Sequence, residues 1–210
     1  SHAILRGSDC GGTYSLIRIE KASPAISDNT FDCGGVSRYE FIGTVAIYIE
    51  SWGGDLYIEN NVLPNQYIRS DESNGDGVLI VANNTLGGVD LDLGVCCSDT
   101  HTNAVIIRDN SFGKNTHKDM GATLSAINVT SGNTSGGSTL VIIKNTIDLR
   151  ESDPSISGIH LGLGFARFTG TVFGTDKRDD GSPISISNNH IMGEKYGMMF
   201  YRYTGSAVEN

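Results

Sequence analysis

Short apolar runs recur along the whole chain, and each is followed by an asparagine, one further residue and a large apolar residue. Six segments have this form: Ala25–Phe31, Leu56–Leu63, Leu79–Leu86, Val105–Phe112, Leu140–Ile147 and Ile184–Ile191. Their asparagines are Asn29, Asn61, Asn84, Asn110, Asn145 and Asn189, at spacings of 32, 23, 26, 35 and 44 residues. A constant motif at irregular spacing favours a β-solenoid, since a turn between stacked strands tolerates insertions. The spacing of 23 suits one coil of three short strands, and the spacing of 44 holds an expected insertion at Phe168–Pro183.

A second strand signal lies between the asparagine motifs. It occurs at Leu16–Glu20, Ala46–Glu50, Gln66–Arg69, Val89–Leu93, Ala126–Thr130, Gly158–Leu163 and Gly197–Tyr203. Most of these segments alternate apolar and polar residues with a period of two, as half-buried strands do. No segment keeps a period of 3.6 over ten residues, so the sequence predicts an all-β fold with almost no helix.

The recurring asparagine has a physical explanation. A coil must bend sharply after its strand, and asparagine tolerates the left-handed backbone conformation better than any residue except glycine. Asparagine amides stacked at about 4.8 Å can also hydrogen-bond from coil to coil. We therefore expect an asparagine ladder at one turn, with the apolar residue two places later pointing inward.

This I-x-I-x-N-N-x-apolar turn resembles that of right-handed parallel β-helices of the pectin-lyase-like class, and most of all phage tailspikes and polysaccharide depolymerases. The resemblance covers about residues 14–203. It implies a single-stranded right-handed parallel β-helix of about six coils, with residues 1–210 as one domain. The termini show no amphipathic capping helix, and the end resembles the opening of another coil, so we expect a fragment of a longer chain.

The resemblance also assigns the strand that follows each asparagine turn and loop to a first sheet, whose outer face commonly carries a carbohydrate groove. With the alternating apolar residues inward, the outward residues form two rows. The first row is Tyr48, Tyr67, Asp90, Asn128, His160 and Met199. The second row is Glu50, Arg69, Asp92, Thr130, Gly162 and Tyr201. Aromatic faces stack on sugar rings, and charged groups bind hydroxyls or carboxylates.

These rows contain the candidate site residues. We assign catalysis to Glu50, Asp90, Asp92 and His160, and substrate binding to Tyr48, Tyr67, Arg69, Asn128 and Tyr201. Asp90 and Asp92 are two residues apart, about 7 Å along a strand, and Glu50 and Asp92 lie two coils apart, roughly 9–10 Å. Both separations are near the ~6.5–9.5 Å that inverting glycosidases need between carboxyl groups. A lyase would instead use Arg69 or His160 as the base. The alternative is that these are ordinary solvated residues on an exposed sheet.

Charge and cysteine content narrow the function classes further. The formal net charge is −9, with 24 acidic and 15 basic side chains and no Lys/Arg cluster, which disfavours nucleic acid and anionic membranes as partners. No apolar stretch reaches about 20 residues, so no membrane insertion is expected. The four cysteines have no zinc-site spacing, and both buried thiols and a Cys10–Cys33 disulfide remain open.

Two acidic segments, Asp71–Gly77 and Asp176–Gly181, are expected to be polar loops. Neither has the spacing of an EF-hand, so no metal or other cofactor is expected.

Three functions are compatible with this pattern. The preferred one is a homotrimeric tailspike-type protein of the virion tail that binds and cleaves a bacterial surface polysaccharide. The second is a secreted, extracellular polysaccharide lyase or hydrolase. The third is a non-catalytic β-helical adhesin or structural shaft.

Overall fold

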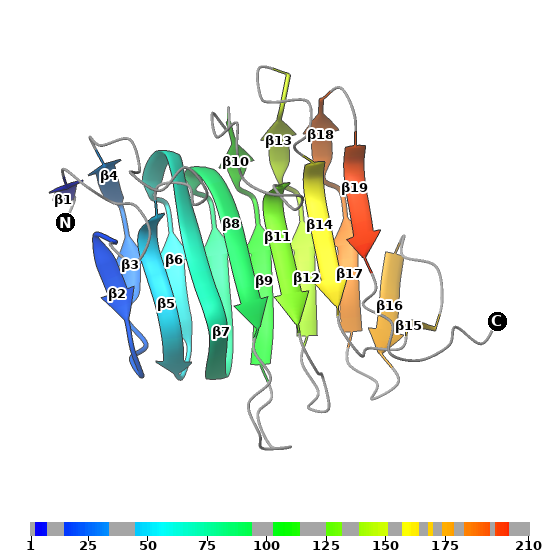
Figure 1. The fold of residues 1–210 in the computed structure, drawn as a ribbon, viewed down its shortest axis with the longest axis horizontal. Helices are drawn as coiled ribbons and strands as arrows, with labels where there is room; N and C mark the ends of the chain where they lie inside the picture. Colours follow the sequence, from blue (N-terminus) through cyan, green and yellow to red (C-terminus); the bar gives the residue numbers. More distant parts are fainter. Residues whose placement is uncertain are drawn as a thin grey trace.

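The computed structural model describes residues 3–7, 15–33, 45–93, 103–113, 125–131, 139–150, 157–163, 168–169, 174–178, 183–193 and 196–201. Every regular element in these ranges is a β-strand, which confirms the predicted all-β class and the lack of helix there. Figure 1 shows the strands side by side along the long axis of the molecule, mostly in sequence order from blue to red, with the orange strand at Gly174–Arg178 drawn beyond the red one. Most neighbouring strands are parallel, so the sheets are stacks of successive repeats.

Three stacks of parallel strands account for most of the pairing. The first stack contains β2 (Ile17–Ile19), β5 (Val45–Gly53), the middle of β7 (Val62–Ala82), the end of β8 (Thr85–Leu93), β11 (Ser125–Ser131), β14 (Ser157–Leu163) and β19 (Tyr196–Tyr201). The second contains β3 (Ala25–Ser27), β6 (Leu56–Glu59), the end of β7, β9 (Asn103–Arg108), β12 (Thr139–Ile143) and β17 (Pro183–Ser187). The third contains β1 (Ala3–Gly7), β4 (Asn29–Cys33), the starts of β7 and β8, β10 (Ser111–Phe112), β13 (Thr146–Asp148) and β18 (His190–Met192).

The core lies between the stacks and consists of apolar side chains aligned from repeat to repeat. In the first stack the aligned residues are Ile47, Ile68, Val89, Ile127 and Ile159, all fully buried. In the third stack they include Phe31, Leu63, Leu86, Phe112 and Ile147, each two places after a motif asparagine. The expected inward position of that apolar residue is therefore confirmed. Burying one such side chain contributes about 1.5–3 kcal/mol, so the repeated rows supply most of the stabilisation.

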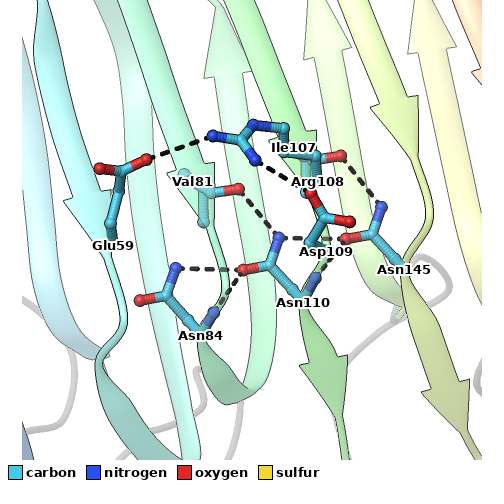
Figure 2. A network of polar contacts seen from close by, with 8 residues as sticks. All are labelled: Glu59, Val81, Asn84, Ile107, Arg108, Asp109, Asn110 and Asn145. Carbon is cyan, nitrogen blue, oxygen red and sulfur yellow. Dashed lines mark hydrogen bonds and ion pairs between the residues drawn. The ribbon is translucent and has the colours of Figure 1, made fainter.

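The asparagine ladder is present and continuous from Asn29 to Asn189, and Figure 2 shows its part from Asn84 to Asn145. Each side-chain amide donates from Nδ2 to Oδ1 of the next motif asparagine, and the five distances run from 3.2 Å at Asn29–Asn61 to 2.9 Å at Asn145–Asn189. The same Oδ1 also accepts the backbone N–H, as in the 2.9 Å contact from Asn84 to Asn110. Nδ2 also donates to a carbonyl of the preceding repeat, for example from Asn110 to Val81 at 2.9 Å. The amides therefore satisfy one another inside the protein.

The bend before each ladder position differs from the prediction. The left-handed residue is the one preceding the asparagine: Asp28, Asn60, Asn83, Asp109, Lys144 and Asn188, with φ between 55° and 59°. Its backbone N–H donates to the next repeat, as Asn83 does to the Arg108 carbonyl at 3.2 Å. The sequence predicted that the ladder asparagine both adopts the left-handed conformation and hydrogen-bonds to the next asparagine. In the structure two adjacent residues share these roles, because a side chain that must reach the neighbouring amide is held on the inner side of the turn.

The two segments expected to be polar loops, Asp71–Gly77 and Asp176–Gly181, both contain strand residues. The insertion at Phe168–Pro183 includes β15 (Phe168–Thr169) and β16 (Gly174–Arg178), and β16 pairs antiparallel with both β15 and β17. The acidic segment Asp71–Gly77 lies within β7, where Asn74–Asp76 pair with Ser51–Gly53. Its interpretation as a loop is therefore wrong.

Candidate functional site

A row of polar side chains follows the outer face of the first stack. The strand register aligns Arg18, Tyr48, Arg69, Asp90, Asn128 and His160, one from each successive strand. We call this set the polar row. It places Asp90, Asn128 and His160 side by side as the sequence predicted, because the alternating residues Val89, Ile127 and Ile159 hold their strands in register.

The C-terminal half of the polar row is a connected chain of contacts. Arg69 Nε lies 3.9 Å from Asp90 Oδ2, and both side chains are only about a quarter exposed, at 21% and 27%. Asn128 Nδ2 donates to Asp90 Oδ1 at 2.7 Å. His160 Nδ1 lies 2.6 Å from Asn128 Oδ1. We call these four residues the relay.

His160 differs from its predicted setting, because only 4% of its surface is exposed. This burial lowers the pKa of the imidazole below its usual value, and the nearby Asp90 carboxylate only partly opposes that shift. The lowered pKa favours the neutral ring near pH 7. A neutral histidine has one donor and one acceptor nitrogen, which is the form that accepts a proton in general base catalysis.

The N-terminal end of the polar row holds an ion pair that the sequence interpretation missed. Arg18 donates from Nε to Glu50 Oε2 at 2.8 Å, and its second guanidinium nitrogen contacts the same oxygen. The guanidinium also lies over the Tyr48 ring, 5.7 Å from the centroid. Aligning the Leu16–Glu20 alternation with Ala46–Glu50 would have placed Arg18 in this row. Glu50 is thus paired, and Tyr48 shares one ring face with a cation.

Tyr67 and Arg69 do not lie where the sequence placed them. The structure aligns Ile68 with Ile47 rather than Ile49, so Arg69 joins Tyr48 and Asp90 instead of Glu50 and Asp92. Tyr67 is only 3% exposed, and its burial raises the pKa of the phenol. The expectation that Tyr67 is an exposed sugar-stacking residue is therefore wrong for the described conformation. Both registers keep Ile68 inward, which is why the sequence did not distinguish them.

The Tyr67 ring occupies the space beside Gly88. A Cβ at Gly88 would overlap Tyr67 Cε1 and lie 2.8 Å from Cδ1. We expect Gly88→Ala to lower the free energy of unfolding by about 1–3 kcal/mol, because a buried ring must be displaced. Gly113→Ala is the matched control, since a Cβ there meets nothing within 4 Å. Urea denaturation of both variants checks this. An equal loss in both would show that the Tyr67 contact does not limit position 88.

The second predicted row is retained only in part. Asp92, Thr130, Gly162 and Tyr201 are aligned on four successive strands. Glu50 has no aligned partner on β7, because the register shifts between Ile49 and Ser51. The Asp92 carbonyl accepts a hydrogen bond from the Ser70 hydroxyl at 3.3 Å. For Tyr201 the structure describes the backbone position alone.

The expectations about metal sites, membrane spans and disulfides can be compared with the structure only in the residues that it describes. Those ranges contain no cluster of three or more metal-binding side chains. They also hold no helix of the length and hydropathy that a bilayer crossing requires. The open question of a Cys10–Cys33 disulfide lies outside the described residues, since Cys10 is not among them.

Comparison of the chain with protein-family models, curated proteins and solved structures finds no match. The fold and the polar row are therefore the basis for inferring function.

Proposed function

We propose that the chain is a right-handed parallel β-helix of the tailspike type that binds a bacterial surface polysaccharide along the first stack and cleaves it. The parallel stacked strands and the continuous asparagine ladder support the β-helix. The right hand follows from the resemblance of the asparagine turn to the pectin-lyase-like class. A homotrimer on the virion tail is part of the same proposal.

The polar row is the single observation that carries the binding proposal. It consists of a cation, an aromatic ring, a second cation, a carboxylate, an amide and an imidazole on six successive strands, which are about 4.8 Å apart. A polysaccharide is itself an extended chain of polar repeating units with apolar ring faces. A row of groups along the stack suits such a ligand better than a compact small molecule, which would contact two or three of them.

Cleavage is assigned to the part of this face with carboxylates and an imidazole. Asp90 and Asp92 are two residues apart on β8, about 7 Å by strand rise, and His160 adds a neutral ring two strands away. Asp92 lies on the same strand as Asp90, and the register aligns it with Thr130 and Gly162 of the next two strands. Its replacement tests the role of a carboxylate in cleavage.

The experiment is incubation of the protein with a panel of bacterial capsular and O-antigen polysaccharides, followed by size analysis of the products and a binding assay. We expect one polysaccharide to be bound and shortened. Asp92→Asn should slow its cleavage by about 10²-fold or more, in line with the contribution of one acid or base group. Asp148→Asn is the control, because Asp148 lies in the third stack and pairs with Arg150.

Each other outcome has a distinct meaning. Binding without shortening would indicate the non-catalytic adhesin or shaft and contradict the cleavage proposal. Full activity in Asp92→Asn would remove that residue from the mechanism. Neither binding nor cleavage of any polysaccharide would contradict the proposed function as a whole.

A further inference from the structure

The hydrogen bonds of the relay determine which ring nitrogen of His160 carries the hydrogen. A carboxylate only accepts hydrogen bonds, so the Asn128 atom 2.7 Å from Asp90 Oδ1 must be the amide nitrogen. The amide oxygen of Asn128 then faces His160 Nδ1 at 2.6 Å. An amide oxygen also only accepts, so Nδ1 must carry the hydrogen. In a neutral ring the other nitrogen, Nε2, is left with a lone pair.

We infer that Asp90 and Asn128 hold His160 in the Nδ1–H tautomer, and that Nε2 is the proton acceptor of the polysaccharide-cleaving site. The role in cleavage rests on the proposed function, whereas the tautomer rests on the relay alone. Asn128 and Asp90 act through His160, so they are positioning residues. The hydrogen bond made by one ring nitrogen commonly determines which nitrogen is available for chemistry.

The proton transfer that this arrangement allows is simple. A water molecule or sugar hydroxyl at Nε2 gives up its proton to the Nε2 lone pair, which leaves a hydroxide or alkoxide nucleophile and an imidazolium. The Nδ1–H bond to Asn128 is retained throughout. The carboxylate of Asp90 lies one amide away and favours the positive ring, so it stabilises the product of the transfer.

The acceptor nitrogen must also be reachable by the proton donor. Three side-chain N or O atoms among the described residues are fully enclosed without a hydrogen-bond partner: Trp52 Nε1, Gln66 Oε1 and Ser125 Oγ. Nε2 of His160 is not one of them, although the whole residue is 4% exposed. A small opening at Nε2 would admit a proton donor while the rest of the ring stays packed.

The tautomer is measured directly by NMR of the intact protein with ¹⁵N-labelled histidine. The chain has five histidines, and loss of one set of signals in His160→Gln assigns those of residue 160. Long-range ¹H–¹⁵N correlations should show a protonated Nδ1 and an unprotonated Nε2 near neutral pH. A protonated Nε2 in the unchanged protein would overturn the inference.

Two variants separate positioning from a merely structural role. Asn128→Leu should release the ring, so that the Nε2–H form becomes populated. Asp90→Asn keeps the shape of the side chain but removes its charge, and should lower the pKa of His160 in a pH titration. Thr130→Val, on the same strand and face as Asn128, should change neither property. Retention of the Nδ1–H form in Asn128→Leu would overturn the positioning role, and Asp90→Asn still tests it if Asn128→Leu does not fold.

Activity on the polysaccharide found in the panel completes the test. Asn128→Leu and His160→Gln should lower kcat by about 10²-fold, because proton acceptance matters in the transition state. Unchanged kcat in His160→Gln would overturn the acceptor role while the tautomer stands. If no polysaccharide is cleaved, the proposed function fails and the NMR result is unaffected.

Discussion

Replacing Asn84 with alanine is expected to lower the free energy of unfolding by about 3–5 kcal/mol. Asn84 Oδ1 accepts two hydrogen bonds from Asn61, at 2.9 and 3.1 Å, and its Nδ2 donates to Ile58 and Asn110. Alanine leaves these partner groups buried and each without a hydrogen bond to residue 84. Each buried polar group that loses its hydrogen bond costs about 1–3 kcal/mol. The loss spans three repeats, so it exceeds that of an ordinary surface hydrogen bond. Urea denaturation followed by circular dichroism measures it.

Asn83 provides the control in the adjacent position. It is the same residue type, but it is exposed and has a φ of 55°. Glycine adopts this conformation without strain, so Asn83→Gly should change stability by no more than about 0.5–1 kcal/mol. If Asn83→Gly and Asn84→Ala destabilise the protein equally, the ladder amide has no special role and the effect belongs to the turn backbone.

Phe112→Ala is expected to have a comparable effect, about 3–5 kcal/mol, because truncating a buried aromatic side chain leaves a cavity. Phe112 is 1% exposed and aligned between Leu86 and Ile147, which are also buried. These neighbours are held by their own ladder asparagines, so they cannot move together to fill the space. The shift of the denaturation midpoint gives the magnitude.

Ser111 is the control for Phe112. It is exposed and lies in the same two-residue strand, β10, so Ser111→Ala should stay within about 0.5 kcal/mol of the unchanged protein. A small loss in Phe112→Ala would mean that the third stack repacks around the missing ring, contrary to a tightly aligned core.

The sequence predicted the ladder and the inward apolar row well, because both depend on residues two positions apart in a motif that recurs six times. A short local pattern of this kind survives loops of any length between its copies. The alternation in Val89–Leu93, Ala126–Thr130 and Gly158–Leu163 also predicted the alignment of Asp90, Asn128 and His160. Each of these strands has two or more alternating inward residues, and together they exclude a shifted register.

The alternation of apolar and polar residues did not predict the register of a strand that has only one inward aliphatic residue. Gln66–Arg69 contains Ile68 as its only aliphatic residue, so a shift by two positions leaves the burial of Ile68 unchanged and moves Arg69 beside a different neighbour. The burial of Tyr67 and His160 depends on side chains from other parts of the chain, which no local pattern contains. The position of the left-handed residue was missed because asparagine, aspartate and lysine all occur there.

The unequal spacing of the ladder asparagines has a consequence for protein engineering. Asparagines 23 and 44 residues apart make the same amide contact, at 3.1 and 2.9 Å. The pairing of the strands therefore does not depend on the length of chain between two ladder asparagines. Guest peptides should therefore be tolerated in the long interval between Asn145 and Asn189. The interval from Asn61 to Asn84 is a poor choice, because β7 runs through nearly all of it as one strand. The molecule thus has the properties of a display scaffold. The stacked strands form its rigid frame, and the long intervals between ladder asparagines are the positions for grafted peptides.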